Sequence, residues 1–117
     1  MKKIIAVDFD GTLSLGVKYP EIGVPNYKLF EYLSRARSSG TADIILWTCR
    51  SGDDLTRAVN WCSENGLEFD AINDNLECIK KTFGDNTRKV VANLYIDDKS
   101  VKPEDFGGVE YENFRDI

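Results

Sequence analysis

Two short acidic segments, far apart in the sequence, carry the side chains best suited to chemistry. The segment DFDGT occupies residues 8–12, and Asp97 and Asp98 form a second pair. Each segment directly follows an apolar run, which is typical of the end of a buried strand. Carboxylates a few ångströms apart either raise one another's pKa or bind a cation. An all-oxygen donor set favours a hard cation, and carboxylates with waters suit Mg²⁺ better than Ca²⁺. The two segments therefore predict a shared Mg²⁺ ion.

The spacing inside DFDGT suits attack on phosphorus. Alternate residues of an extended chain lie on the same side, so Asp8 and Asp10 can act next to each other. A nucleophilic carboxylate at Asp8 would form an aspartyl-phosphate. Asp10 could protonate the leaving oxygen and then deprotonate the water that hydrolyses the intermediate. Gly11 would relieve the backbone where the chain turns away. We therefore predict a phosphohydrolase with Asp8 as its nucleophile.

The transferred phosphoryl group also needs donors and positive charge around its oxygens. Thr48 offers a hydroxyl at the end of the apolar run 44–47. A helix that begins near residues 52–53 would direct backbone N–H groups to the same edge of the sheet. Lys89 precedes the last predicted buried strand and Lys99 follows it. By spacing alone, both lysines are candidates for the fixed cation.

The neighbours of Thr48 have open interpretations. Arg50 either grips a second phosphate or the leaving group, or forms a surface salt bridge. For Cys49, a small buried hydrophobe is favoured over a reactive thiol, because no base is evident in the sequence. Asn73, at the end of a predicted strand, is expected to cap a helix rather than to touch substrate.

Bulk composition limits the class of protein. The 117 residues predict one domain, with 42% hydrophobic and 30% charged residues, as in ordinary globular proteins. The net charge of −5 argues against an obligate nucleic-acid or anionic membrane partner, although a local basic patch could outweigh it. Three cysteines fit neither a disulfide framework nor a CxxC metal site, and the absence of histidine excludes histidine chemistry. The first apolar run is too short for a signal peptide, so we expect a cytoplasmic protein.

Apolar patterning predicts alternating strands and helices. The expected strands are residues 3–7, 44–47, 69–72 and 90–96, with a short edge strand at 109–111, and the expected helices run from Asn26 to near Gly40, from Asp53 or Asp54 to Gly66, and over 76–84. This alternation predicts a three-layer α/β/α sandwich with a mostly parallel sheet. If Asp8 and the later acidic pair share one ion, the first strand must lie between the second and the fourth.

Taken together, the motifs resemble those of the haloacid dehalogenase (HAD) superfamily of phosphatases and phosphotransferases. DFDGTL at 8–13 is similar to its first motif, DxDGT[LV], and ILWT at 45–48 to its second. YIDD at 95–98 is similar to the fourth, and Lys89 stands where short HAD-like proteins of phage and bacteria carry the lysine of the third. The resemblance covers nearly the whole chain and implies a Rossmannoid sheet.

The resemblance also implies roles for individual residues. Asp8 would be the nucleophile, and Asp10 the general acid/base that also meets Mg²⁺ through its backbone carbonyl. Thr48 and Lys89 would hold the phosphoryl oxygens. The expected metal set is Asp8, Asp10, Asp97 and Asp98, and the expected substrate-binding set is Gly11, Thr12, Thr48, Cys49, Arg50 and Lys89.

Unlike typical HAD enzymes, this sequence leaves no room for a cap domain. The stretches 14–43 and 49–88 are taken up by predicted core elements and by a flap at 19–25. An uncapped site would admit bulky phosphorylated substrates, or would be covered by a second copy of the chain.

Three other functions compete with hydrolysis. A phosphotransferase would use the same residues, and a metal-binding protein on this scaffold would show little turnover. A receiver-type signalling domain is disfavoured, because its acidic pair comes first in the sequence and here it comes last.

Overall fold

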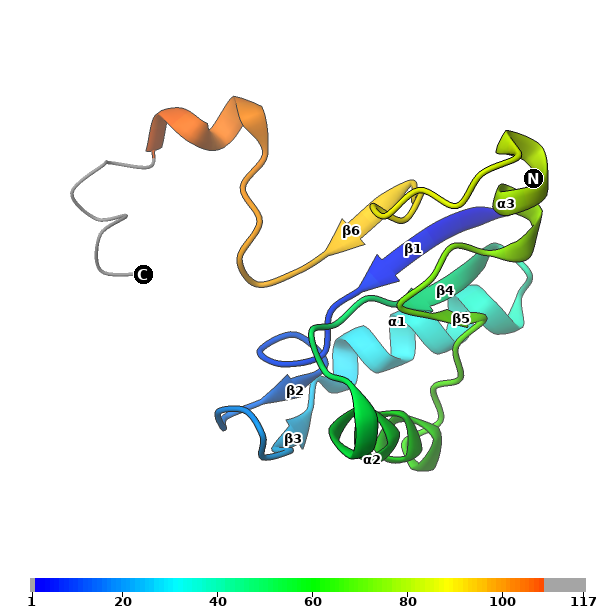
Figure 1. Cartoon of the computed structure of the whole chain (residues 1–117). Helices are drawn as coiled ribbons and strands as arrows, with labels where there is room; N and C mark the ends of the chain where they lie inside the picture. The colour runs from blue at the N-terminus through cyan, green and yellow to red at the C-terminus, as the bar shows by residue number, and fades with distance from the viewer. Residues whose placement is uncertain (1, 109–117) are drawn as a thin grey trace.

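The computed structural model describes residues 2–108, and these form an α/β fold around one parallel sheet (Figure 1). Four strands lie in the order β5-β4-β1-β6, and each neighbouring pair is parallel. Their bounds are Lys3–Val7 for β1, Ala42–Leu46 for β4, Ala71–Ile72 for β5 and Leu94–Ile96 for β6. The helices are Tyr27–Ser38 (α1), Gly52–Glu64 (α2) and Glu77–Phe83 (α3). The predicted α/β fold with a mostly parallel sheet is confirmed.

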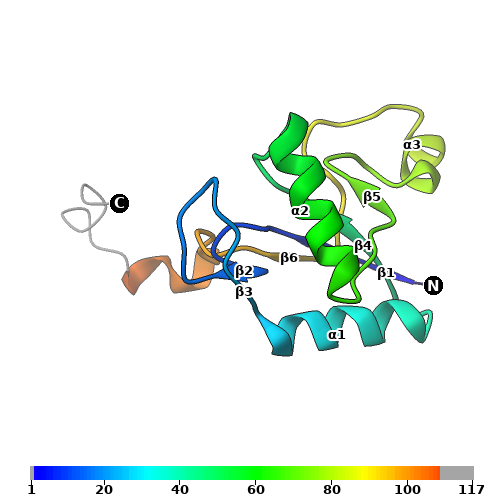
Figure 2. The same cartoon turned by 90° about the horizontal axis from the view of Figure 1, so that it is seen from below.

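Apolar side chains cover both faces of the two central strands. One face packs against α1 and α2, which lie on the same side of the sheet (Figure 2). The other face packs against the segment that carries α3. The first cluster includes Ile5, Val7, Ile44, Leu46, Phe30, Leu33, Ala58 and Cys62, and the second Ile4, Ala6, Ile45, Leu76 and Val90. Continuous burial of residues 4–7 and 44–46 explains why these runs are apolar without alternation.

Both edge strands are shorter than predicted, for the same physical reason. The side chain of Asn93 accepts a hydrogen bond from the N–H of Ile4 at 2.8 Å, and Asp70 does the same for Ile44 at 2.8 Å. A side-chain oxygen thus replaces a main-chain carbonyl just before β6 and just before β5. Regular pairing begins only after these residues, so the predicted strands 90–96 and 69–72 each lose their first half.

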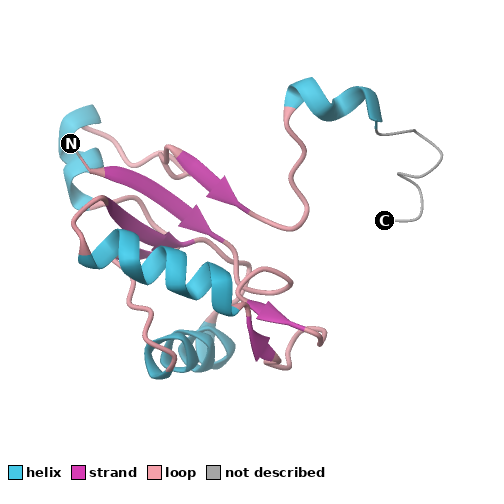
Figure 3. Ribbon diagram, turned by 180° about the vertical axis from the view of Figure 1, so that it is seen from behind, coloured by secondary structure: helices cyan, strands magenta, loops and turns pink. Residues whose placement is uncertain are grey.

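The predicted loop after the first strand contains a small hairpin. Strands β2 (Ser14–Leu15) and β3 (Val24–Pro25) pair antiparallel. The predicted flap at 19–25 falls on the loop between them and on β3, and from here on the loop 16–23 is called the flap. A 3₁₀ helix, η1 (Pro103–Gly108), was not predicted and stands apart from the sheet (Figure 3). The predicted edge strand at 109–111 lies outside the described residues. Within residues 2–108, no helix is long and apolar enough to cross a membrane.

Candidate active site

The two acidic segments meet at the carboxyl ends of β1 and β6. These strands are parallel neighbours with Val7 opposite Ile96, and the N–H of Asp8 donates to the carbonyl of Ile96 at 2.9 Å. One carboxylate oxygen from each of Asp8, Asp97 and Asp98 lies within 4.8 Å of the other two. The sheet therefore brings together the side chains of three of the four predicted metal-binding residues, although Asp8 and Asp97 are far apart in sequence.

Asp8 is the carboxylate most disturbed by its surroundings. Burial, followed by the negative charges of Asp97, Asp98 and Asp10, raises the pKa of Asp8 from 3.8 to about 6, against an opposing hydrogen bond from the backbone of Phe9. A cation would relieve this repulsion. The donors are all carboxylate oxygens, and two of the three residues are exposed to solvent. Their chemistry thus fits a hard ion that retains waters, such as Mg²⁺.

A tight turn after Phe9 directs the first acidic segment. The N–H groups of Thr12, Leu13 and Ser14 all donate to the carbonyl of Phe9 at 2.9–3.2 Å. Gly11 adopts φ +77°, and a Cβ there would lie 2.3 Å from a carboxylate oxygen of Asp98. A side chain at position 11 would therefore push Asp98 out of the cluster.

The structure separates Thr12 from the nucleophile. Thr12 is buried, and its Oγ1 has no hydrogen-bond partner among the described residues. With Gly11 and Asn26 it lines a hollow beside the acidic pair that does not include Asp8. Gly11 and Thr12 line this hollow rather than the pocket that contains Asp8 and Asp10, and their contact with substrate stays a prediction.

A pocket of about 480 Å³ joins most of the predicted groups. It is lined by Asp8, Asp10, Tyr19, Thr48, Cys49, Arg50, Asp97 and Lys99. Tyr19 comes from the flap, so the predicted flap does lie next to the acidic cluster. Cys49 is exposed in this pocket, which corrects the expectation of a buried thiol. The chain has left β4 before residue 49 and no longer faces the core.

Asn73 holds the loop that carries Thr48. Its Oδ1 accepts the N–H of Thr48 at 2.8 Å, and its Nδ2 donates to the carbonyl of Arg50 at 3.3 Å. Asn73 itself has a φ of 52°, in the left-handed region that asparagine tolerates better than most residues. The prediction that Asn73 caps a helix is wrong, since α3 begins after Leu76. Its position at a strand end was visible in the sequence, but not its partner.

Arg50 is buried, which contradicts both interpretations of it. Its side chain is 1% exposed, and its Nε and Nη2 donate to the two carboxylate oxygens of Asp10 at 2.9 and 2.8 Å. Nη2 also donates to the carbonyls of Pro20 and Glu21 in the flap, each at 3.1 Å. Arg50 is therefore neither a free grip for phosphate nor a surface salt bridge. It is a buried partner of Asp10.

The two candidate lysines approach the cluster through different pockets. Lys89 is exposed, with its Nζ 5.1 Å from the ring centroid of Tyr95, and lines a pocket of about 610 Å³ with Asp8 and Asp97. Lys99 lines the smaller pocket with Asp8 and Asp10. Within residues 2–108, neither lysine forms an ion pair. Asp8 thus lies where two pockets adjoin. The larger pocket is lined by Lys89 and Lys102, and the smaller one by Lys99.

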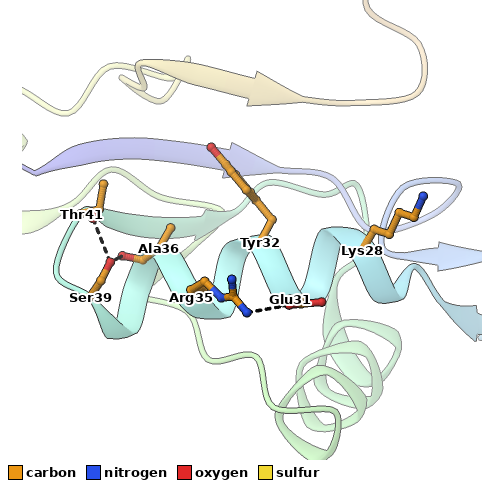
Figure 4. A pocket seen from close by; sticks show the side chains of 7 residues that line it. All are labelled: Lys28, Glu31, Tyr32, Arg35, Ala36, Ser39 and Thr41. Carbon is orange, nitrogen blue, oxygen red and sulfur yellow. Dashed lines mark hydrogen bonds and ion pairs between the residues drawn. The ribbon is translucent and has the colours of Figure 1, made fainter.

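A further hollow lies along α1 and extends to Thr41, just before β4 (Figure 4). Three charged side chains line it, Lys28, Glu31 and Arg35, and the last two pair with each other at 2.8 Å. Ser39 and Thr41 bond to each other at its far end. The hollow contains no carboxylate cluster and no nucleophile beside a base, so we do not assign it to the active site.

Similarity to a known structure supports a common family but names no activity. The chain is similar to a conserved protein from Bacteroides thetaiotaomicron, with 35% identity and a TM-score of 0.73 over 98% of this chain and 87% of that one. No protein-family model matches the chain, and no curated protein matches it. Identity and coverage of this size go beyond a shared fold. The chain belongs to the same family as this conserved Bacteroides protein.

Proposed function

We propose that the protein is a Mg²⁺-dependent phosphatase of the HAD type that hydrolyses phosphomonoesters through an aspartyl-phosphate on Asp8. The observation that carries the proposal is the meeting of Asp8, Asp97 and Asp98 within 4.8 Å at the ends of two parallel strands. Asp10 and Thr48 line the same pocket as Asp8. The order of these residues in the sequence supports the HAD assignment. We include in the proposal the three-layer sandwich, the central first strand and the absence of a cap that this assignment implies.

In this mechanism the chain supplies the nucleophile, the proton for the leaving oxygen and the groups that orient the phosphoryl group. An oxygen of Asp8 attacks phosphorus, and the bond to the leaving oxygen breaks as Asp10 protonates that oxygen. Asp10 then takes a proton from the water that releases phosphate and restores Asp8. The Thr48 hydroxyl holds a phosphoryl oxygen, and Lys89 or Lys99 balances its charge. Mg²⁺, held by Asp8, Asp97 and Asp98, would neutralise the charge that builds on the transferred group.

The substrate is a phosphorylated molecule that enters an open site. Two adjoining pockets of about 480 and 610 Å³ leave Asp8 accessible without a cap. The acidic composition favours a cytoplasmic enzyme without a membrane partner and disfavours a nucleic-acid substrate unless a local basic patch binds it. A second copy of the chain would cover the uncapped site, or the site would stay open. Transfer of the phosphoryl group to an acceptor other than water would use the same residues.

The test is phosphate release from 4-nitrophenyl phosphate with and without Mg²⁺. The wild-type protein is expected to turn over only with the metal, and Asp8→Asn to lose at least about 10⁴-fold, because the nucleophile is gone. Asp43→Asn is the matched control, since Asp43 lies on β4 away from the pocket and pairs with the exposed Lys2. Full activity of Asp8→Asn would end the proposal. Mg²⁺ binding by calorimetry without turnover would favour a metal-binding protein on this scaffold.

A further inference from the structure

We propose that Arg50 is a positioning residue that acts through Asp10 and couples it to the flap. The inference rests on the proposed function, because it needs Asp10 to be the general acid/base. It goes beyond that function by assigning a role to a buried arginine whose hydrogen bonds go to Asp10, to the flap and to α2.

The first support is the set of hydrogen bonds that the Arg50 guanidinium donates. Two donors grip both oxygens of Asp10, and Nη2 also reaches the flap carbonyls of Pro20 and Glu21. Nη1 donates to the carbonyl of Asp54 in α2 at 3.4 Å. Paired, planar hydrogen bonds of this kind fix the orientation of a carboxyl group. One guanidinium therefore joins Asp10, the flap and α2.

The second support is the packing of the guanidinium between two aromatic rings. Its central carbon lies 4.8 Å from the ring centroid of Phe9 and 5.1 Å from that of Tyr19. The Tyr19 hydroxyl donates to the carboxylate of Asp54, which ties the flap to α2 at a second point. Lysine can replace the charge of arginine, but neither its fork of donors nor its flat, stacked shape. The site therefore selects arginine by geometry.

The third support is that Asp10 stays available for chemistry while it is held. Its side chain is 33% exposed, whereas that of Arg50 is 1% exposed, and Asp10 lines the pocket with Asp8. A general acid must meet the leaving oxygen at hydrogen-bond distance, and small misplacements of such groups are costly. Without Arg50, the Asp10 carboxylate would be free to rotate and the flap carbonyls would lose their donor.

The experiment is a double-mutant cycle on kcat. Arg50→Met and Arg50→Lys are each made in the wild-type chain and in Asp10→Asn, and assayed with Mg²⁺ on 4-nitrophenyl phosphate and on glycerol 3-phosphate. If Arg50 acts through Asp10, Arg50→Met lowers kcat about 100-fold in the wild-type chain but less than about 3-fold in Asp10→Asn. The loss is larger for glycerol 3-phosphate, because an alkoxide leaving group needs the proton more than nitrophenolate does. Arg50→Lys falls between Arg50→Met and the wild type.

Arg37→Met is the matched control. Arg37 also grips both oxygens of one aspartate, Asp70, but away from the pocket, and its replacement is expected to leave kcat unchanged. Thermal unfolding checks each variant, and if Arg50→Met does not fold, Arg50→Lys carries the cycle with an expected loss of about 10-fold.

The outcomes separate the inference from the function on which it rests. Equal losses in both backgrounds, or equal losses on both substrates, overturn the positioning role while leaving the phosphatase intact. A wild-type protein without Mg²⁺-dependent hydrolysis overturns the proposed function and the inference together.

Discussion

The two halves of the candidate site differ in how firmly the fold holds them. The β1–β4 half consists of the turn at 8–12 and the loop at 48–50, and hydrogen bonds from Asn73 and Arg50 fix it. The β6 half consists of Asp97, Asp98 and Lys89, all exposed. The one side-chain hydrogen bond of this half among the described residues joins Asp97 to the N–H of Lys99 at 2.7 Å.

The difference indicates a division of labour. Groups that move protons need a fixed orientation, which the β1–β4 half provides without a ligand. The carboxylates of the β6 half repel Asp8, and a cation would relieve that repulsion. Changes in the first half should therefore lower kcat at any Mg²⁺ concentration, whereas changes in the second should alter the Mg²⁺ requirement. The following predictions test that contrast.

After the nucleophile Asp8 itself, the largest effect is expected at Asp10. Replacing it with Asn removes the transferable proton while leaving an acceptor for Arg50, so kcat should fall about 10²- to 10⁴-fold. Added Mg²⁺ should not restore the activity. Initial rates of Asp10→Asn over a range of Mg²⁺ concentrations measure this directly. Recovery of kcat at high Mg²⁺ would contradict the proposed difference between the two halves.

The next largest effect is expected at Asp98 and Asp97. Each Asn replacement removes one charged ligand, so the Mg²⁺ concentration for half-maximal rate should rise about 10- to 100-fold. The maximal rate should recover largely at high metal. Calorimetric titration with Mg²⁺ should report the same shift, with Asp105→Asn as an exposed acidic control. Loss of maximal rate with unchanged metal affinity would contradict the assignment of these residues to the ion.

Lys89 and Lys99 should be distinguishable by a smaller effect. Removing the cation that balances the phosphoryl charge should cost about 10- to 100-fold in kcat/KM. Lys89→Met is expected to show this loss, as the sequence motif implies, and Lys99→Met to show little. Steady-state kinetics on one substrate decide between them. The reverse result would assign the charge-balancing role to Lys99 in the smaller pocket instead of Lys89 in the larger one.

The smallest effect concerns stability and its dependence on pH. Because the folded state raises the pKa of Asp8 from 3.8 to about 6, Asp8 contributes stability below 3.8 that is lost as the pH rises through 6. Without metal and near pH 3.8, Asp8→Asn should unfold at the same temperature as the wild type. Above pH 6 its Tm should be higher, by on the order of 3 °C.

Saturating Mg²⁺ should then raise the Tm of the wild type and not that of the variant, since binding stabilises only the folded state that holds the ion. A wild-type Tm that is unaffected by Mg²⁺ above pH 6 would speak against a metal site at Asp8.

Local patterns in the sequence predicted the central sheet and the acidic cluster well. The runs 3–7 and 44–47 are apolar because both faces of these strands are buried, so they are easily recognised. The meeting of Asp8 with Asp97 and Asp98 could be predicted because the carboxyl ends of neighbouring parallel strands lie at the same edge of the sheet. The edge strands were predicted too long, because whether Asn93 or Asp70 replaces a backbone partner depends on contacts distant in sequence.

The interpretation of Arg50 failed for a related reason. A charged residue after a strand end is usually exposed, and nothing local indicates that Phe9, Tyr19 and Asp10 will enclose it. Asn73 likewise accepts a hydrogen bond from the N–H of Thr48, 25 residues earlier in the chain. Such partners are decided by how the flap and the loop at 48–50 pack together.

The most direct test of the account is to trap the intermediate on Asp8. The protein is quenched during turnover with Mg²⁺ and an aryl phosphate and treated with borohydride, which reduces an acyl phosphate to an alcohol. Mass spectrometry then identifies the reduced residue. We expect homoserine at position 8, absent when Mg²⁺ or substrate is omitted. Reduction at another carboxylate, or turnover with Asp8 unmodified, would contradict the central claim.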